Sequence, residues 1–306
     1  MVLWDAAVET AAIILAWRDC RQTFLFQHEA CDLMNSANAN QGLDLRALLP
    51  KVCLLAQEAG RRIMEIYATD FSITDKEDES PLTAADLASH HAIVEGLTAL
   101  TPGVPVLSEE SASIPYSERA RWRDYWLIDP LDGTREFIKR NGEFTVNIAL
   151  IHDQLPVLGV VQVPVSGLCY YACSGGGAFK QLPGEAAQAI QVKKLGSGPV
   201  MVVGSRSHRG DSLNAFLERI GPHEIISMGS ALKICLVGEG KADIYPRLGL
   251  TSEWDTAAAH SVVLEAGGAL TDTLGIPLRY NTKDSLLNPH FLVFGDSSRD
   301  WVQLLQ

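Results

Sequence analysis

Apolar residues recur at helical spacing in the stretch that begins at Leu45. Leu48, Val52 and Ile63 fall on one face, and charged residues occupy the other faces, which predicts an amphipathic helix with one buried side. A second helical pattern covers residues 84–100 and stops where a proline and a glycine follow.

The middle of the chain has the pattern of strands. Short apolar runs occupy residues 104–107 and 125–128, and further apolar or alternating runs follow at 144–151, 157–163 and 168–172. Runs separated by such short turns predict a sheet that is mostly antiparallel.

Strand and helix patterns alternate in the last third of the chain. An apolar run at 200–203 is followed by helical patterns at 212–220, 231–239 and 256–265, and strands are expected near 225, 244 and 291–294. This alternation predicts a second α/β unit. We therefore expect an N-terminal α+β subdomain at 45–180 and a C-terminal α/β subdomain at 181–306. Residues 1–44 are expected to be an extension of unknown role, either a packed amphipathic helix or a segment outside the fold.

Composition and charge narrow the classes of function. The chain has 306 residues, of which 47% are hydrophobic, and its 37 acidic and 25 basic residues give a net charge of −12. A largely disordered protein and a binder of nucleic-acid polymers are therefore not expected. The six cysteines include no C-x-x-C pair, which indicates reduced thiols. We expect a cytoplasmic protein without an obligate protein partner, and a peripheral association with the inner face of the membrane stays open.

Acidic residues gather at three places next to predicted elements. Glu109 follows the run at 104–107, Asp129 and Asp132 follow the run at 125–128, and Asp255 opens a helix. Strand ends are where open α/β folds place their ligands, so we expect one site. Neighbouring carboxylates repel unless a cation holds them, and oxygen ligands favour a hard cation such as Mg²⁺. Each motif alone also fits a structural role as a solvated loop, a turn or a helix cap.

The three motifs together are specific. The strings SEE at 108–110, WLIDPLDGT at 126–134 and WDTAA at 254–258 resemble the inositol monophosphatase superfamily of Mg²⁺-dependent, lithium-sensitive phosphatases. Within it, the strings KRNGEFTVN at 139–147, SRSH at 205–208 and LNP at 287–289 are similar to bacterial 3'(2'),5'-bisphosphate nucleotidases. The resemblance covers about residues 45–294. It implies an α/β fold, a layered α/β/α/β/α sandwich of two subdomains with the metal site between them.

The resemblance also implies the residues of the site, with two or three Mg²⁺ ions. The metal ligands would be Glu109, Asp129, the carbonyl of Leu131, Asp132 and Asp255. The catalytic residues would be Asp86, Thr134 and Glu109, with Asp86 and Thr134 hydrogen-bonding or deprotonating the attacking water. The substrate would contact Leu131, Asp132, Gly133, Thr134, Ser205, His208, Gly229, Ser230, Lys233 and Asp255. Lys233, with Arg206 or Arg247, is expected to neutralise the phosphate that is not cleaved.

The leading hypothesis is a phosphatase that acts on a small nucleotide bisphosphate. It would remove the 3'-phosphate of adenosine 3',5'-bisphosphate, or of the sulfated form of that nucleotide, to leave AMP. An inositol or sugar phosphate phosphatase is the alternative within the superfamily. A non-catalytic nucleotide or metal sensor on the same fold is the alternative from another class.

Overall fold

The computed structural model describes residues 43–69, 81–204 and 211–305. Asp44–Gln306 form one compact unit. The expected N-terminal extension and the expected substrate residues Ser205 and His208 lie outside the described residues, as does Arg206. None of the described helices combines the length and the apolar character needed to span a membrane.

Two long helices form the first layer. Helix α3 (Leu45–Tyr67) begins at Asp44, whose side chain accepts a hydrogen bond from the Ala47 amide, and it buries the apolar face predicted from the sequence. Helix α4 (Pro81–Leu100) begins three residues before the predicted helix and packs against α3. Both helices contact one face of the first sheet.

The first sheet has seven strands in the order β1-β2-β3-β4-β5-β6-β7. Strand β1 runs parallel to β2, and every later pair is antiparallel, which confirms the predicted antiparallel middle of the chain. The short strands β6 and β7 were not predicted, because neither carries a strong apolar pattern. The strands are β1 (Val106–Ser108), β2 (Asp124–Asp132), β3 (Thr145–His152), β4 (Leu155–Gln162), β5 (Cys169–Cys173), β6 (Gly177–Gln181) and β7 (Gln188–Ile190).

The second sheet has the order β11-β12-β10-β8-β9. Strand β8 is parallel to β9 and β10, and β12 is antiparallel to β10 and β11. The strands are β8 (Val200–Gly204), β9 (His223–Ser227), β10 (Ile244–Arg247), β11 (Ala269–Asp272) and β12 (Phe291–Phe294). The helices of this part are α7 (Asp211–Ile220), α8 (Leu232–Gly238) and α9 (Trp254–Glu265), and short turns of helix occur at η1 (Glu109–Ser111), α5 (Tyr116–Arg119), α6 (Thr134–Ile138) and η2 (Gln303–Leu305).

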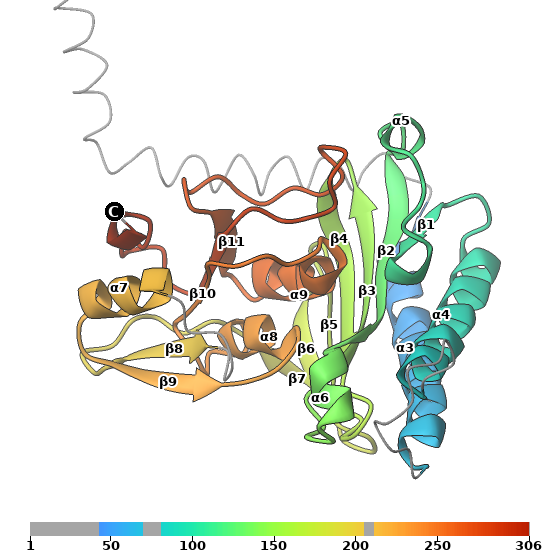
Figure 1. Ribbon diagram of the computed structural model, residues 1–306, viewed down its shortest axis with the longest axis horizontal. Coiled ribbons are helices and arrows are strands. Elements are labelled where there is room, and N and C mark those ends of the chain that lie inside the picture. Colours follow the sequence, from blue (N-terminus) through green and yellow to red (C-terminus); the bar gives the residue numbers. More distant parts are fainter. Residues whose placement is uncertain (1–42, 70–80, 205–210, 306) are drawn as a thin grey trace, which may run out of the picture. The chain divides into compact units, whose positions relative to one another are not determined.

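Helices α8 and α9 lie between the two sheets (Figure 1). Successive residues of β10 show this arrangement, because Ile244 packs with α7 on the outer face while Tyr245 joins the large core around α8 and α9. The layers are thus α3 and α4, the first sheet, α8 and α9, the second sheet, and α7. This order confirms the predicted α/β/α/β/α sandwich, and the subdomain boundary near residue 180 stays a prediction.

Candidate active site

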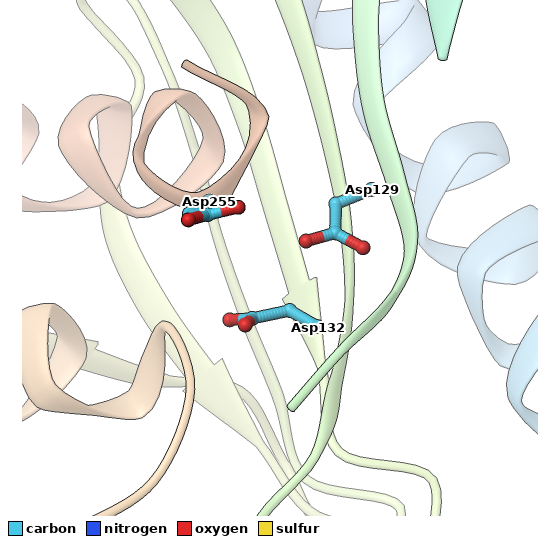
Figure 2. Close-up of side chains that lie close together, drawn as sticks. All are labelled: Asp129, Asp132 and Asp255. Atoms are coloured by element: carbon cyan, nitrogen blue, oxygen red, sulfur yellow. The ribbon is translucent and has the colours of Figure 1, made fainter. Parts of the chain in front are cut away.

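Three aspartates converge where β2 ends and α9 begins. Asp129 and Asp132 lie at the C-terminal end of β2, and Asp255 lies in the first turn of α9. One carboxylate oxygen from each lies within 4.8 Å of the others, and Figure 2 shows the three side chains facing one another. The pairing of β2 with β3 shifts register between Asp129 and Asp132. This irregularity is what lets both side chains of one strand reach the same point.

Ionisation of the three aspartates is unfavourable, because they are buried and repel one another. Burial raises the pKa of Asp129 well above its ordinary value, and the charges of Asp132 and Glu109 raise it further. The pKa of Asp255 rises to about 7 for the same reasons, with Asp132 as its main neighbouring charge. Burial also raises the pKa of Asp132, although the cation of Lys233 opposes this effect. The cluster therefore favours either protons or a bound cation.

Hydrogen bonds from two side chains of β3 and from a backbone amide just before α8 fix the orientation of Asp132. Its Oδ2 atom accepts a hydrogen bond of 2.6 Å from the Ala231 amide and longer ones of 3.4 Å from Thr145 and Asn147. The Ser230 hydroxyl lies 2.9 Å from the Asp132 carbonyl and 2.7 Å from the Glu143 carbonyl. These hydrogen bonds to Oδ2 hold the Asp132 carboxylate in one orientation.

Asp86 and Glu109 lie beside the cluster. Glu109 begins η1 and is exposed. The pKa of Glu109 is raised by desolvation and by Asp132, and hydrogen bonds with Asp129 and Trp254 oppose the shift. Asp86 on α4 is buried, and its pKa rises to about 8 because of burial and the nearby charges of Glu110 and Glu109. Its Oδ1 has no hydrogen-bond partner among the described residues.

A cleft of about 350 Å³ opens beside the aspartates. Of the residues predicted from the sequence, it is lined by Asp132, Gly133, Thr134, Gly229, Ser230, Lys233 and Asp255. Leu131 is buried, and its amide donates to Asp129 Oδ1 at 3.1 Å. Gly133 adopts a positive φ of 97° at the start of α6, which is the left-handed conformation that glycine tolerates best.

Sequence reasoning missed several groups that support the site. The Ser89 hydroxyl on α4 donates to the Pro130 carbonyl at 2.7 Å and so anchors the turn between the two aspartates. Ala231 and Tyr245 were also missed. No local motif could have identified these residues, because each acts on a segment distant in the sequence.

The donor set fits a divalent cation that prefers oxygen. Three carboxylate oxygens face one point, no thiol or imidazole belongs to the group, and their repulsion is relieved when a cation binds. Asp129, Asp132 and Asp255 are therefore the described residues best placed to hold it, with Glu109 at the edge.

The comparisons with known proteins agree with this geometry. Residues 44–295 match the inositol monophosphatase family. The chain is 51% identical over 248 residues to the 3'(2'),5'-bisphosphate nucleotidase CysQ of Salmonella typhimurium, a match that covers 80% of this chain and 99% of that protein. It is 41% identical over 266 residues to the corresponding protein of Haemophilus influenzae, covering 85% of this chain and 97% of that one.

Solved structures of the inositol monophosphatase family are also similar to this chain. The crystal structure of CysQ from Bacteroides thetaiotaomicron, a bacterial member of the inositol monophosphatase family, superposes with a TM-score of 0.71 at 43% identity, covering 79% of this chain and 94% of that one. An inositol monophosphatase from Zymomonas mobilis gives a TM-score of 0.71 at 22% identity over 86% of this chain and 99% of that one, which is a likeness of fold. From its fold, its acidic site and these matches, the chain belongs to the inositol monophosphatase family.

Proposed function

We propose that this chain is a Mg²⁺-dependent 3'(2'),5'-bisphosphate nucleotidase. It removes the 3'-phosphate of adenosine 3',5'-bisphosphate and leaves AMP and inorganic phosphate. The observation that carries this proposal is the position of Asp132 and Asp255 in the same cleft as the cation of Lys233. Relatives with 41–51% identity named as such nucleotidases support the choice of substrate.

Asp129, Asp132 and Asp255 would hold the metal, with Glu109 and the Leu131 carbonyl completing its ligands. When bound, two or three Mg²⁺ ions supply activation of water and stabilisation of the charge that develops on the leaving oxygen. The fixed orientation of Asp132 serves this role, because the Ala231 amide leaves one of its carboxylate oxygens for the cation.

Asp86 and Thr134 would handle the proton of the attacking water. Oδ1 of Asp86 is buried and has no partner among the described residues, so it can accept a hydrogen bond from water or from the Thr134 hydroxyl. Burial and the charges of Glu110 and Glu109 raise the pKa of Asp86 to about 8. The amides of Gly133 and Thr134 would bind oxygens of the phosphate that is cleaved.

Phosphate release from three substrates tests this proposal. Adenosine 3',5'-bisphosphate, inositol 1-phosphate and fructose 1,6-bisphosphate would be compared with Mg²⁺, then with added Li⁺. We expect the nucleotide to have the highest kcat/KM and Li⁺ to inhibit. A preference for inositol 1-phosphate or the sugar bisphosphate would overturn the substrate assignment, and tight nucleotide binding without turnover would indicate a sensor.

A further inference from the structure

The peptide group between Pro130 and Leu131 connects helix α4 with the aspartate cluster. Its carbonyl, on Pro130, accepts a hydrogen bond of 2.7 Å from the Ser89 hydroxyl of α4. Its N–H, on Leu131, donates at 3.1 Å to Oδ1 of Asp129. Because a peptide group is planar, both hydrogen bonds belong to one rigid unit. A chain of two hydrogen bonds therefore leads from Ser89 to a carboxylate oxygen of the cluster.

The ladder between β2 and β3 is interrupted at this peptide group. The two strands are in register from Asp124 to Asp129 and pair again at Asp132, and the register shifts between the two aspartates. Pro130 and Leu131 lie within this shift, where regular pairing no longer fixes the backbone. The Ser89 hydroxyl thus supplies a contact at a point where the sheet itself is irregular.

The groups of this hydrogen-bond chain are shielded from water. Ser89, Asp129, Pro130 and Leu131 are all buried. A buried carbonyl that loses its donor is left unsatisfied, which is unfavourable, unless the peptide group turns toward another donor. Removal of the Ser89 hydroxyl therefore favours a rotation of the peptide group, and a rotated peptide group no longer holds the carboxylate of Asp129.

Helix α4 also contacts a second acidic segment beside Ser89. The His90 Nδ1 atom lies 2.8 Å from the Ser108 hydroxyl, and Ser108 directly precedes Glu109. Asp86 lies three residues before Ser89, so the two side chains are neighbours on one side of the helix. One helix thus carries Asp86 and contacts both the strand end before Glu109 and the turn at the end of β2.

We propose that Ser89 is a positioning residue of the metal site, which sets the affinity for the cation by orienting Asp129 through the peptide group that its hydroxyl contacts. The inference rests on the proposed function, in which Asp129 is a metal ligand, and it adds a residue that acts through another one.

The mutual repulsion of the aspartates explains why this orientation matters. One carboxylate oxygen from each of Asp129, Asp132 and Asp255 lies within 4.8 Å of the others. Repulsion at this distance would turn a freely rotating carboxylate away from its neighbours. A carboxylate that is held in place keeps its oxygen directed at the cluster, so a cation meets a set of ligands that is already arranged.

Mg²⁺ binding without substrate tests the inference in the full chain. The midpoint of thermal unfolding would be followed as Mg²⁺ is added, which gives an apparent dissociation constant for the wild type and for Ser89→Ala. We expect Ser89→Ala to raise this constant by about 10-fold to 100-fold. With saturating Mg²⁺, its KM for adenosine 3',5'-bisphosphate should stay within about twofold of the wild-type value, because the substitution removes no substrate contact.

Thr101→Val is the matched control. Thr101 follows the last residue of α4, and its buried hydroxyl accepts a hydrogen bond of 2.8 Å from the Trp126 indole, near the start of β2. The control also removes a buried hydroxyl between α4 and β2, so it should lower the unfolding temperature and leave the Mg²⁺ dissociation constant unchanged. If Ser89→Ala does not fold, Ser89→Cys retains a weak donor of similar size and should give a smaller rise.

The outcomes separate the inference from the proposed function. An unchanged Mg²⁺ dissociation constant in the folded Ser89 variant, or an equal rise in Thr101→Val, would overturn the role of Ser89. A wild-type protein that binds Mg²⁺ without hydrolysing the bisphosphate would instead overturn the proposed function and leave the role of Ser89 standing.

Discussion

The Ala231 amide donates a hydrogen bond of 2.6 Å to Oδ2 of Asp132, which lies 99 residues earlier in the chain. The adjacent Ser230 hydroxyl contacts the carbonyls of Asp132 and Glu143. The residues just before α8 thus orient an acidic residue at the end of β2. Ser230 itself has a positive φ of 49°, an unfavourable conformation for a residue with a side chain.

The Ser230 contacts predict a change in metal dependence. Ser230→Ala removes both hydroxyl contacts, so the Mg²⁺ concentration for half-maximal activity should rise roughly 10-fold to 100-fold, as for other residues that orient a metal ligand. Ser230→Gly also removes the hydroxyl but relieves the positive φ, so it should be the more stable variant by about 1 kcal/mol. Mg²⁺ titration of activity and urea unfolding measure the two effects. A rise in KM for the nucleotide with an unchanged Mg²⁺ requirement would show direct substrate contact instead.

Gly133 provides a second test of the contacts that the Ser230 hydroxyl makes. A Cβ at this position would overlap the Ser230 hydroxyl and would also meet the positive φ of 97°. Gly133→Ala should therefore displace Ser230, reduce kcat by at least about tenfold and destabilise the protein. Gly103 is a matched control, because its φ is 89° but no atom lies within 4 Å of an added Cβ. Gly103→Ala should cost about 1 kcal/mol and leave kcat unchanged. Equal activity in the two variants would contradict the role of the Ser230 contact.

The raised carboxylate pKa values predict that the metal-free protein loses stability as pH rises. The pKa of Asp255 is about 7 and that of Asp86 is about 8 in the folded state, against about 3.9 in an unfolded chain. Between the unfolded and the folded pKa values the native state binds more protons than the unfolded chain, so its stability declines as pH rises from about 4 to about 8 and levels off above the folded-state pKa values. Urea unfolding at pH 5.5 and pH 8 with a chelator should show the decline, and Mg²⁺ should remove it.

Asp132→Asn tests whether the carboxylate cluster causes the loss of stability of the metal-free protein as pH rises. The amide keeps an oxygen for the Ala231 hydrogen bond but removes one charge. Compared with the wild type, we expect the variant to be more stable at pH 8 without metal and to gain less stability when Mg²⁺ is added. We also expect kcat to fall by at least about 100-fold. Asp284, whose side chain is 90% exposed, provides the control Asp284→Asn. Wild-type rates for Asp132→Asn at saturating Mg²⁺ would exclude Asp132 as a ligand.

His260 should make the protein lose stability as pH falls, which is the opposite of the effect of the raised carboxylate pKa values. Burial lowers the pKa of His260 to about 3 in the folded state, while an unfolded histidine has a pKa of about 6.5. The unfolded state binds more protons between these values, so stability falls as pH drops below 6.5, by about 1.4 kcal/mol per pH unit.

His260→Gln retains a polar partner for Tyr280, which lies 2.9 Å from the histidine Nδ1. This variant should show a shallower loss between pH 6.5 and 4.5 in urea unfolding. His290→Gln, at an exposed position, should keep the wild-type slope; parallel slopes for all three proteins would refute the prediction.

The sequence determined the local features of this protein. Helical spacing predicted α3 and the later helices, and apolar runs predicted most strands, because side-chain periodicity reflects which face of an element is buried. The acidic motifs at the end of β2 and the start of α9 predicted the carboxylate cluster, since strand ends collect at one edge of a sheet. These inferences required only residue types at short spacing.

The tertiary structure decided which distant groups act on that cluster. The amide of Ala231 carries no sequence signal, since any non-proline residue could donate the same hydrogen bond. Either Arg206 or Arg247 could have joined Lys233 by sequence, and the packing of β10 against α8 places Arg247 in its cleft. Such contacts follow from the packing of two sheets around shared helices, which brings together residues whose separation along the chain gives no measure of their distance in space.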